Sequence, residues 1–364
     1  MDSEARRPSS LQTLQDFVTA ARAALSDEIW DYLIGGSETE TTVCRNRQAI
    51  ESLAFRPRVL RRVDKIDTGA DFLGKPVTMP VFLAPVGSIG SFWENAPDAL
   101  GRAATDFGVP VFGSAVKAEM LDAIAAAASG PKVFQIYTRG DRAWIDGNIE
   151  RVAAAGYDAC AITVDNAVTS RRERDMLKGF EKPWRKAATG MNHQAAFDWD
   201  DVKYLRDKHA IKLIIKGINT AEDAAKACEI GVDVVHISNH GGRQLDSGRG
   251  TLKALPEVVA AVKGRAKIFI DGGFCRGTDI VKALILGADM VGIGRMYLYG
   301  LATDGYDGVT SVLNILENEI ATCMALLGAA RLSDLDGSLL EAAVPVYPSH
   351  VHSAFPLLSH YQPK

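Results

Sequence analysis

The chain has 364 residues, of which 47% are hydrophobic and 24% are charged, and its formal net charge is −4. This length fits one large α/β barrel with extensions, and the negative charge gives no electrostatic basis for binding nucleic acid or an anionic membrane. The five cysteines lack CxxC spacing, and no apolar run approaches the roughly 20 residues that span a bilayer. The first ten residues also lack the apolar centre of a secretory signal. We therefore expect a cytoplasmic protein without a bound metal.

The N-terminal part of the chain, residues 1–79, is predicted to be an extension, with helical patterns in segments 11–26 and 27–36. From residue 80 onward, short apolar runs alternate with amphipathic segments. The apolar runs are unbroken rather than alternating, as expected for parallel strands that are covered on both faces. The eight predicted strands are 80–86, 109–113, 132–137, 159–165, 212–217, 232–237, 267–270 and 290–293.

Amphipathic segments between these strands, such as 100–107 and 255–262, have apolar residues at helical spacing. Thr220 and Thr278 are predicted to cap two of the helices at their N-termini. Eight β/α alternations predict a closed (β/α)8 TIM barrel. We expect a single domain over 1–364, in which 80–330 form the barrel and 331–364 form a C-terminal tail.

An open, doubly wound sheet is the alternative architecture. No GxGxxG motif follows the first strand, which weakens that alternative because such sheets use this motif to bind a dinucleotide. Residues 166–198, rich in Arg, Lys and Gly, form a long insertion after the fourth predicted strand. A connection of this length in a compact domain is typical of a lid or a mobile segment.

The most informative motif is ISNHGGRQLD at 237–246, which ends the sixth predicted strand. It places His240 and Arg243 three residues apart on a backbone with two glycines. Imidazole exchanges a proton near neutral pH, and guanidinium holds a carboxylate by two parallel hydrogen bonds. A base beside a carboxylate clamp suits chemistry at the carbon next to a carboxylate. The alternative interpretation is a capped strand end with a surface arginine.

The other predicted strands also end in polar residues or glycine, and catalytic groups of such barrels gather at the C-terminal ends of the strands. After the last two strands, Gly272, Gly273 and Gly294 expose backbone N–H groups beside Arg276 and Arg295. Loops at these two positions are the usual phosphate-binding place of this fold. We therefore expect a cofactor that carries a phosphate.

Together these motifs resemble the FMN-dependent α-hydroxy-acid oxidase and dehydrogenase family, which includes glycolate oxidase, lactate oxidase, mandelate dehydrogenase and the flavin domain of flavocytochrome b2. The resemblance covers about residues 11–330. It implies a TIM barrel, an FMN cofactor, oxidation of a small 2-hydroxy acid to a 2-oxo acid, and a homotetramer. The motifs that carry it are FRPRVL at 55–60, QIY at 135–137, TVD at 163–165, KGI at 216–218, SNHGGRQLD at 238–246, DGG at 271–273 and GR at 294–295.

The resemblance also implies roles for individual residues. His240 would be the base and Asp165 would orient it, Tyr32 and Tyr137 would hydrogen-bond the substrate, and Arg172 and Arg243 would hold the substrate carboxylate. Lys216 would lie at the N1–C2 edge of the flavin, where a fixed cation favours the reduced ring. The residues expected to bind FMN are Ala84, Pro85, Val86, Gly87, Ser114, Gln135, Thr163, Lys216, Ser238, Asp271, Gly272, Gly273, Phe274, Cys275, Arg276, Gly294 and Arg295.

The sequence departs from the family pattern at several positions. Val116 and Thr169 replace larger pocket residues, so we expect a substrate bulkier than glycolate, including aromatic acids. The lid is shorter than in plant-type members. Cys275 stands where the family usually has arginine, and Arg276 is expected to compensate. Gly87, which would lie against flavin N5, leaves open whether oxygen or another acceptor reoxidises the flavin.

Three alternative functions remain. The chain could be a relative that oxidises an amine or carbinolamine centre in peptide or natural-product maturation. It could be a flavin-dependent isomerase of the isopentenyl diphosphate type, although the carboxylate clamp at Arg172 and Arg243 disfavours a diphosphate substrate. It could also be a flavin-binding protein without catalysis, which the full set of site residues disfavours.

Overall fold

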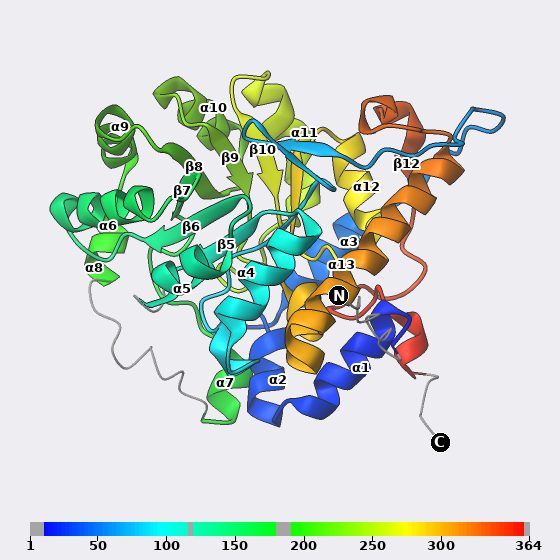
Figure 1. Cartoon of the computed structure of the whole chain (residues 1–364), viewed down its shortest axis with the longest axis horizontal. Coiled ribbons are helices and arrows are strands. Elements are labelled where there is room, and N and C mark those ends of the chain that lie inside the picture. The colour runs from blue at the N-terminus through cyan, green and yellow to red at the C-terminus, as the bar shows by residue number, and fades with distance from the viewer. Residues whose placement is uncertain (1–10, 116–118, 180–190, 360–364) are drawn as a thin grey trace, which may run out of the picture.

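The computed structural model describes residues 11–115, 119–179 and 191–359. Eight parallel strands close into a barrel in the order β10-β11-β4-β5-β6-β7-β8-β9 (Figure 1). The pairing of β11 with β4 closes the sheet, so the predicted TIM barrel is confirmed and the open doubly wound sheet is excluded. The strands are β4 Val81–Leu83, β5 Val111–Ser114, β6 Lys132–Tyr137, β7 Ala159–Thr163, β8 Lys212–Ile218, β9 Val234–Ile237, β10 Lys267–Ile270 and β11 Met290–Ile293.

Helices surround the barrel, and the longer ones bury apolar residues against the strands or neighbouring helices. Helix α13 is kinked at Asp304 and Gly305, where the backbone leaves the helical region. A Cβ on Gly305 would lie 2.6 Å from the Trp93 ring, so the kink needs glycine. The helices of this layer are α4 Ala96–Phe107, α5 Glu119–Ala127, α6 Arg142–Ala154, α7 Glu173–Leu177, α8 Met191–Ala196, α9 Trp199–Lys208, α10 Ala221–Ile230, α11 Thr251–Val262, α12 Gly277–Ile285 and α13 Arg295–Leu327.

The N-terminal extension forms three helices, α1 Leu14–Ala24, α2 Asp27–Ile34 and α3 Thr41–Glu51. Helix α1 starts at a capping box between Thr13 and Asp16 and packs its apolar face against α13. The first two helices match the predicted segments. Helix α3 was not predicted, because most of the residues that it buries are polar.

Two small sheets complete the fold. Strands β2 Ala70–Phe72 and β3 Lys75–Val77 form a hairpin whose Phe72 packs against Phe269 in the barrel, with ring centroids 5.6 Å apart. Strand β1 Leu53–Phe55 pairs with β12 Leu340–Ala342 and so joins the C-terminal tail to the N-terminal extension. The tail also has short 3-10 helices at Leu332–Asp334, Gly337–Leu339 and Pro356–Ser359, and the single-domain division stays a prediction.

The two predicted helix caps have different outcomes. Thr220 caps α10 by accepting a hydrogen bond from the Asp223 backbone N–H, as predicted. The prediction for Thr278 is wrong, because α12 begins at Gly277 and its N-cap is Arg276. The Asp279 carboxylate accepts the Arg276 backbone N–H and thereby sets the earlier start. Within the described ranges, no helix is both long and apolar enough to cross a membrane.

Candidate active site

A cavity opens at the C-terminal ends of the barrel strands and encloses about 1140 Å³, part of it open to solvent. Its wall combines strand ends with α2, α3 and the C-terminal tail. The cavity brings together most of the predicted site residues. Those in its wall are Tyr32, Ala84, Pro85, Val86, Gly87, Tyr137, Arg172, Lys216, His240, Arg243, Asp271, Gly272, Gly273, Phe274, Cys275, Gly294 and Arg295.

His240 is held in one orientation by two neighbours. Its Nδ1 lies 2.9 Å from Asp165 Oδ1, and its backbone N–H donates to Ser238 Oγ at 3.1 Å. The backbone of His240 is left-handed, with φ of 58°, which aims the ring back toward the cavity. Gly217 permits the close approach of Asp165, since a Cβ there would lie 2.8 Å from the Asp165 backbone N.

The protonation state of His240 follows from this setting. Burial lowers the pKa of His240 below its usual value, and the Asp165 carboxylate partly opposes that shift. Because Asp165 accepts a hydrogen bond, Nδ1 carries the hydrogen and Nε2 has a free lone pair. The ring therefore suits a general base. The Tyr137 ring lies parallel to it with centroids 6.4 Å apart.

Two arginines share the same end of the cavity. Burial and the neighbouring Arg243 charge lower the pKa of Arg172 to about 10. Arg243 donates to the backbone oxygens of Tyr32 at 2.7 Å and Gly35 at 3.0 Å, and its Cζ lies 4.7 Å from the Tyr32 ring centroid. In the described part of the chain, neither guanidinium forms a salt bridge with a carboxylate. Two partly buried, adjacent cations favour an anionic ligand between them.

Lys216 sits in a buried polar cluster below the cavity. Its Nζ donates to Ser238 Oγ at 2.7 Å and lies 3.3 Å from Asp271 Oδ2. Asp271 also accepts from Ser238 at 2.6 Å and contacts His236 Nε2 at 3.0 Å. Lys216 and His236 hold the pKa of Asp271 well below its usual range. The Asp271 carboxylate thus orients the lysine, and it offers no donor to a phosphate.

The loop after β10 forms a glycine cradle. Gly272 and Gly273 have φ of 117° and 87°, and a Cβ on Gly272 would lie 2.6 Å from Thr251 Oγ1. Only glycine fits there, so its backbone N–H can face the cavity. Beside it, Arg295 donates to the backbone oxygens of Leu33, Gly35 and Gly241 at 3.2, 2.9 and 3.0 Å.

The electrostatics of this end favour an anion. Burial and the Arg243 charge lower the pKa of Arg295 to about 10, and no carboxylate within the described ranges forms a salt bridge with it. Such a cation is stabilised when an anion binds beside it.

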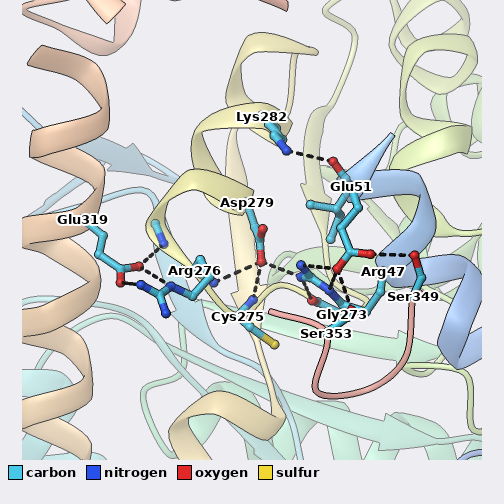
Figure 2. A network of polar contacts seen from close by, with 12 residues as sticks. Arg47, Glu51, Gly273, Cys275, Arg276, Asp279, Lys282, Glu319, Ser349 and Ser353 are labelled. Carbon is cyan, nitrogen blue, oxygen red and sulfur yellow. Dashed lines mark hydrogen bonds and ion pairs between the residues drawn. The ribbon is translucent and has the colours of Figure 1, made fainter. Parts of the chain in front are cut away.

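Cys275 and Arg276 differ from the expectation for this end. Burial raises the pKa of the Cys275 thiol to about 11, so it adds no charge to the cavity wall. The Arg276 side chain forms an ion pair with Glu319 of α13, with Nε 3.2 Å from Oε2, and does not line the cavity (Figure 2). The expected compensation by Arg276 is therefore wrong, because Glu319 holds its guanidinium on the outer side of the loop.

Three residues predicted to contact the flavin, Ser114, Gln135 and Thr163, are buried and lie outside the cavity wall. Ser114 Oγ donates to Gln135 Oε1 at 2.6 Å. Among the described residues, Gln135 Nε2 and Thr163 Oγ1 are buried without a hydrogen-bond partner. Buried polar atoms are normally satisfied, so these two atoms fit a ligand with ring oxygens and nitrogens, as a flavin has.

Sequence analysis missed part of the wall. The cavity is also lined by Asn46 and Arg47 of α3, by Phe92, and by Val351 of the C-terminal tail. No local signal marks them, because α3 has the composition of a surface helix. Thr169, which was expected to enlarge the pocket, is exposed and outside the cavity wall. The related expectation for Val116 lies outside the described residues.

Comparison with known proteins identifies the family. Residues 21–342 match the family of FMN-dependent dehydrogenases. The chain belongs to this family. It is therefore an FMN-dependent oxidoreductase of the 2-hydroxy-acid oxidase and dehydrogenase type, and the glycine cradle, Arg295 and the unpartnered Gln135 and Thr163 atoms fit FMN.

This family member has relatives over nearly its whole length. It is 36% identical to an L-lactate oxidase of Nostoc sp., over 92% of this chain and 99% of that protein. It is 37% identical to a peroxisomal (S)-2-hydroxyacid oxidase of Arabidopsis thaliana, over 88% of this chain and 94% of that one. A mandelate oxidase structure with (S)-2-phenylpropionate superposes with a TM-score of 0.85 at 35% identity, and covers 93% of this chain and 100% of its own. The structure of a soluble mutant of the membrane-associated (S)-mandelate dehydrogenase from Pseudomonas putida superposes with a TM-score of 0.86 at 35% identity. The match covers 92% of this chain and 100% of that one.

Proposed function

We propose that the chain oxidises a 2-hydroxy acid to the 2-oxo acid in this cavity, with His240 as the base. The observation that carries the proposal is the imidazole fixed by Asp165 at 2.9 Å in the same cavity as Arg172 and Arg243. Bound FMN would accept the two electrons that leave the substrate carbon. His240 Nε2 would take one of the two protons that the oxidation removes, from the hydroxyl or from the α-carbon, and Asp165 would stabilise the imidazolium that forms. The second proton would go to the flavin together with the electrons.

The groups around His240 would orient the acid. Arg172 and Arg243 would hold its carboxylate by charge-assisted hydrogen bonds. Burial and the nearby Asp165 charge raise the pKa of Tyr137 to about 12, so its hydroxyl keeps its hydrogen and can donate to a substrate oxygen. Tyr32, stacked on Phe92 with centroids 5.9 Å apart, would form the opposite wall.

The cofactor would lie across the floor of the cavity. Lys216 would face the N1–C2 edge of the ring, where reduction places negative charge. Gly272, Gly273, Gly294 and Arg295 would hold the phosphate by backbone N–H groups and one guanidinium. Residues 84–87, with Ser114, Gln135 and Thr163, would contact the ring.

We further propose that the acid is bulkier than glycolate and that aromatic acids are substrates. The cavity wall near Tyr32 includes Phe92 and Leu298, which suit an apolar substituent. Two superposing structures are described as a mandelate oxidase and a mandelate dehydrogenase, which act on an aromatic 2-hydroxy acid.

The test of this function is loss of the yellow flavin colour when FMN-loaded protein meets a panel of acids without oxygen. We expect faster bleaching by mandelate and other bulky 2-hydroxy acids than by glycolate. Bleaching by amines alone would select the amine- or carbinolamine-oxidising alternative. Isomerisation of isopentenyl diphosphate without net bleaching would select the isomerase. Return of colour when air is admitted then measures whether oxygen is the acceptor.

For assembly and compartment, we propose a cytoplasmic homotetramer. Four apolar side chains, Val59, Leu60, Val344 and Val346, are at least 79% exposed, which favours burial against another copy. Sedimentation equilibrium should give four times the 39.2 kDa chain mass, and a monomer would contradict the proposal.

A further inference from the structure

The phosphate end of the cavity includes a guanidinium that the sequence motifs do not mark. Arg47 of α3 lies 226 positions before Gly273 in the sequence, yet its Nη1 donates to the Gly273 backbone oxygen at 2.7 Å. Its side chain is 4% exposed and lines the same cavity as Gly273 and Cys275.

Arg47 also contacts the cradle loop indirectly, through the buried carboxylate of Asp279. Its Nη1 lies 2.6 Å from Asp279 Oδ2, and the same oxygen accepts the backbone N–H groups of Cys275 at 2.9 Å and Arg276 at 3.1 Å. The guanidinium thus holds the start of the segment 273–276 directly and its end through Asp279 (Figure 2).

The other side of the guanidinium contacts Glu51. Arg47 Nε and Nη2 donate to Glu51 Oε1 at 3.2 and 3.1 Å. Glu51 in turn accepts the hydroxyls of Ser349 at 2.6 Å and Ser353 at 2.5 Å, on either side of the cavity residue Val351 (Figure 2). Arg47 therefore joins the cradle loop to the tail segment that covers it.

Arg47 is one of two arginines in the cavity wall beside the glycine cradle. Cys275, which follows the glycine cradle, is a neutral thiol. Arg276 is paired with Glu319 outside the cavity. Of the arginines near the cradle, this leaves Arg295 and Arg47 in the cavity wall. Among the described residues, the contacts of Arg47 engage four of its five N–H groups and leave one Nη2 hydrogen.

We propose that Arg47 is the positioning residue that gives this chain its preference for a phosphorylated flavin. It fixes the backbone of the cradle loop through the Gly273 carbonyl oxygen and through Asp279, and it keeps a guanidinium in the wall beside the phosphate. The proposal rests on the FMN dependence of the family.

A purely structural ion pair is the competing explanation, because removing one partner of a buried pair destabilises a fold in any case. Riboflavin separates the two explanations, since it has the same ring as FMN but lacks the phosphate. A structural role predicts equal losses of affinity for both flavins. A role at the phosphate predicts a loss for FMN alone.

The experiment measures dissociation constants of FMN and riboflavin for the full chain stripped of flavin, by quenching of flavin fluorescence. In Arg47→Met, we expect the affinity ratio of FMN to riboflavin to fall roughly 10- to 100-fold, the loss typical of a charge-assisted hydrogen bond. Arg206→Met is the matched control, because Arg206 pairs with Asp233 at 3.3 Å outside the cavity wall. Its ratio should equal that of the unchanged chain.

An unchanged ratio in Arg47→Met would overturn the proposal. If that variant does not fold, Arg47→Lys is measured in the same way. An ammonium group keeps the charge but cannot reach Gly273, Asp279 and Glu51 together, so the ratio should still fall, and an unchanged ratio would again overturn the proposal. If the unchanged chain does not bind FMN more tightly than riboflavin, the proposed phosphate site itself is wrong, whatever Arg47 does.

Discussion

Replacing His240 by alanine is expected to slow reduction of the bound flavin by a 2-hydroxy acid by roughly 10²- to 10⁴-fold, the usual contribution of a general base. FMN should stay bound, because His240 faces the substrate end of the cavity and the phosphate cradle lies around Gly272 and Gly273. Stopped-flow absorbance without oxygen measures the rate, and the absorbance of the purified protein measures the bound flavin.

Asp165→Asn is the companion variant. It keeps the imidazole but removes the carboxylate that holds Nδ1–H at 2.9 Å and stabilises the imidazolium. We expect a loss in the same direction with full flavin content. If His240→Ala reduces its flavin as fast as the unchanged chain, His240 is not the base, whatever Asp165→Asn does.

Arg172→Met is expected to raise the acid concentration that gives half-maximal flavin reduction by a factor on the order of 100 or more. The substitution removes the buried guanidinium that would pair with the substrate carboxylate. Arg172 forms no salt bridge with a carboxylate in the described chain, and its pKa is lowered to about 10 by burial and by Arg243. Substrate binding would supply the missing anion. Titration of the anaerobic reduction rate with the acid measures the effect.

Two controls sharpen this result. Arg172→Lys keeps the positive charge but loses the planar guanidinium. The acid concentration that gives half-maximal reduction should therefore lie between those of the unchanged chain and Arg172→Met. The methyl ester of the acid has no carboxylate, so the preference of Arg172→Met for the acid over the ester should be much smaller than that of the unchanged chain, with Arg243 supplying what remains. A variant that still prefers the acid as strongly as the unchanged chain would show that the carboxylate is held elsewhere.

The barrel could be predicted from the sequence because its signals are local. Most strands are buried on both faces and therefore contain short apolar runs, as in VFL at 81–83 and LII at 213–215. Polar groups such as Tyr137 and Lys216 interrupt or end these runs, and the C-terminal ends of the strands meet at one rim. Chain order therefore placed His240 and Arg243 at this rim, and the family resemblance added Asp165 and Arg172 to the site.

The remaining features depend on contacts between distant segments. Arg47 becomes part of the site only through Gly273 and Asp279, and nothing in the polar sequence of α3 indicates that it is buried. Arg276 looked like a phosphate ligand by position, but Glu319, 43 residues later, holds its side chain outside. His236 seemed part of an apolar strand, whereas its ring contacts Asp271 in the interior. Partners at such separations leave no periodic signal.

The most direct test of the account is the pH dependence of anaerobic flavin reduction by the acid. The proposed mechanism requires a neutral His240, and burial lowers the pKa of His240 below the usual 6.5. The second-order rate constant should therefore rise with pH through a single acid limb below pH 6.5 and then level off, and that limb should vanish in His240→Ala. A rate that falls as pH rises through this range, or an acid limb that persists unchanged in His240→Ala, would contradict a mechanism in which this imidazole takes the proton.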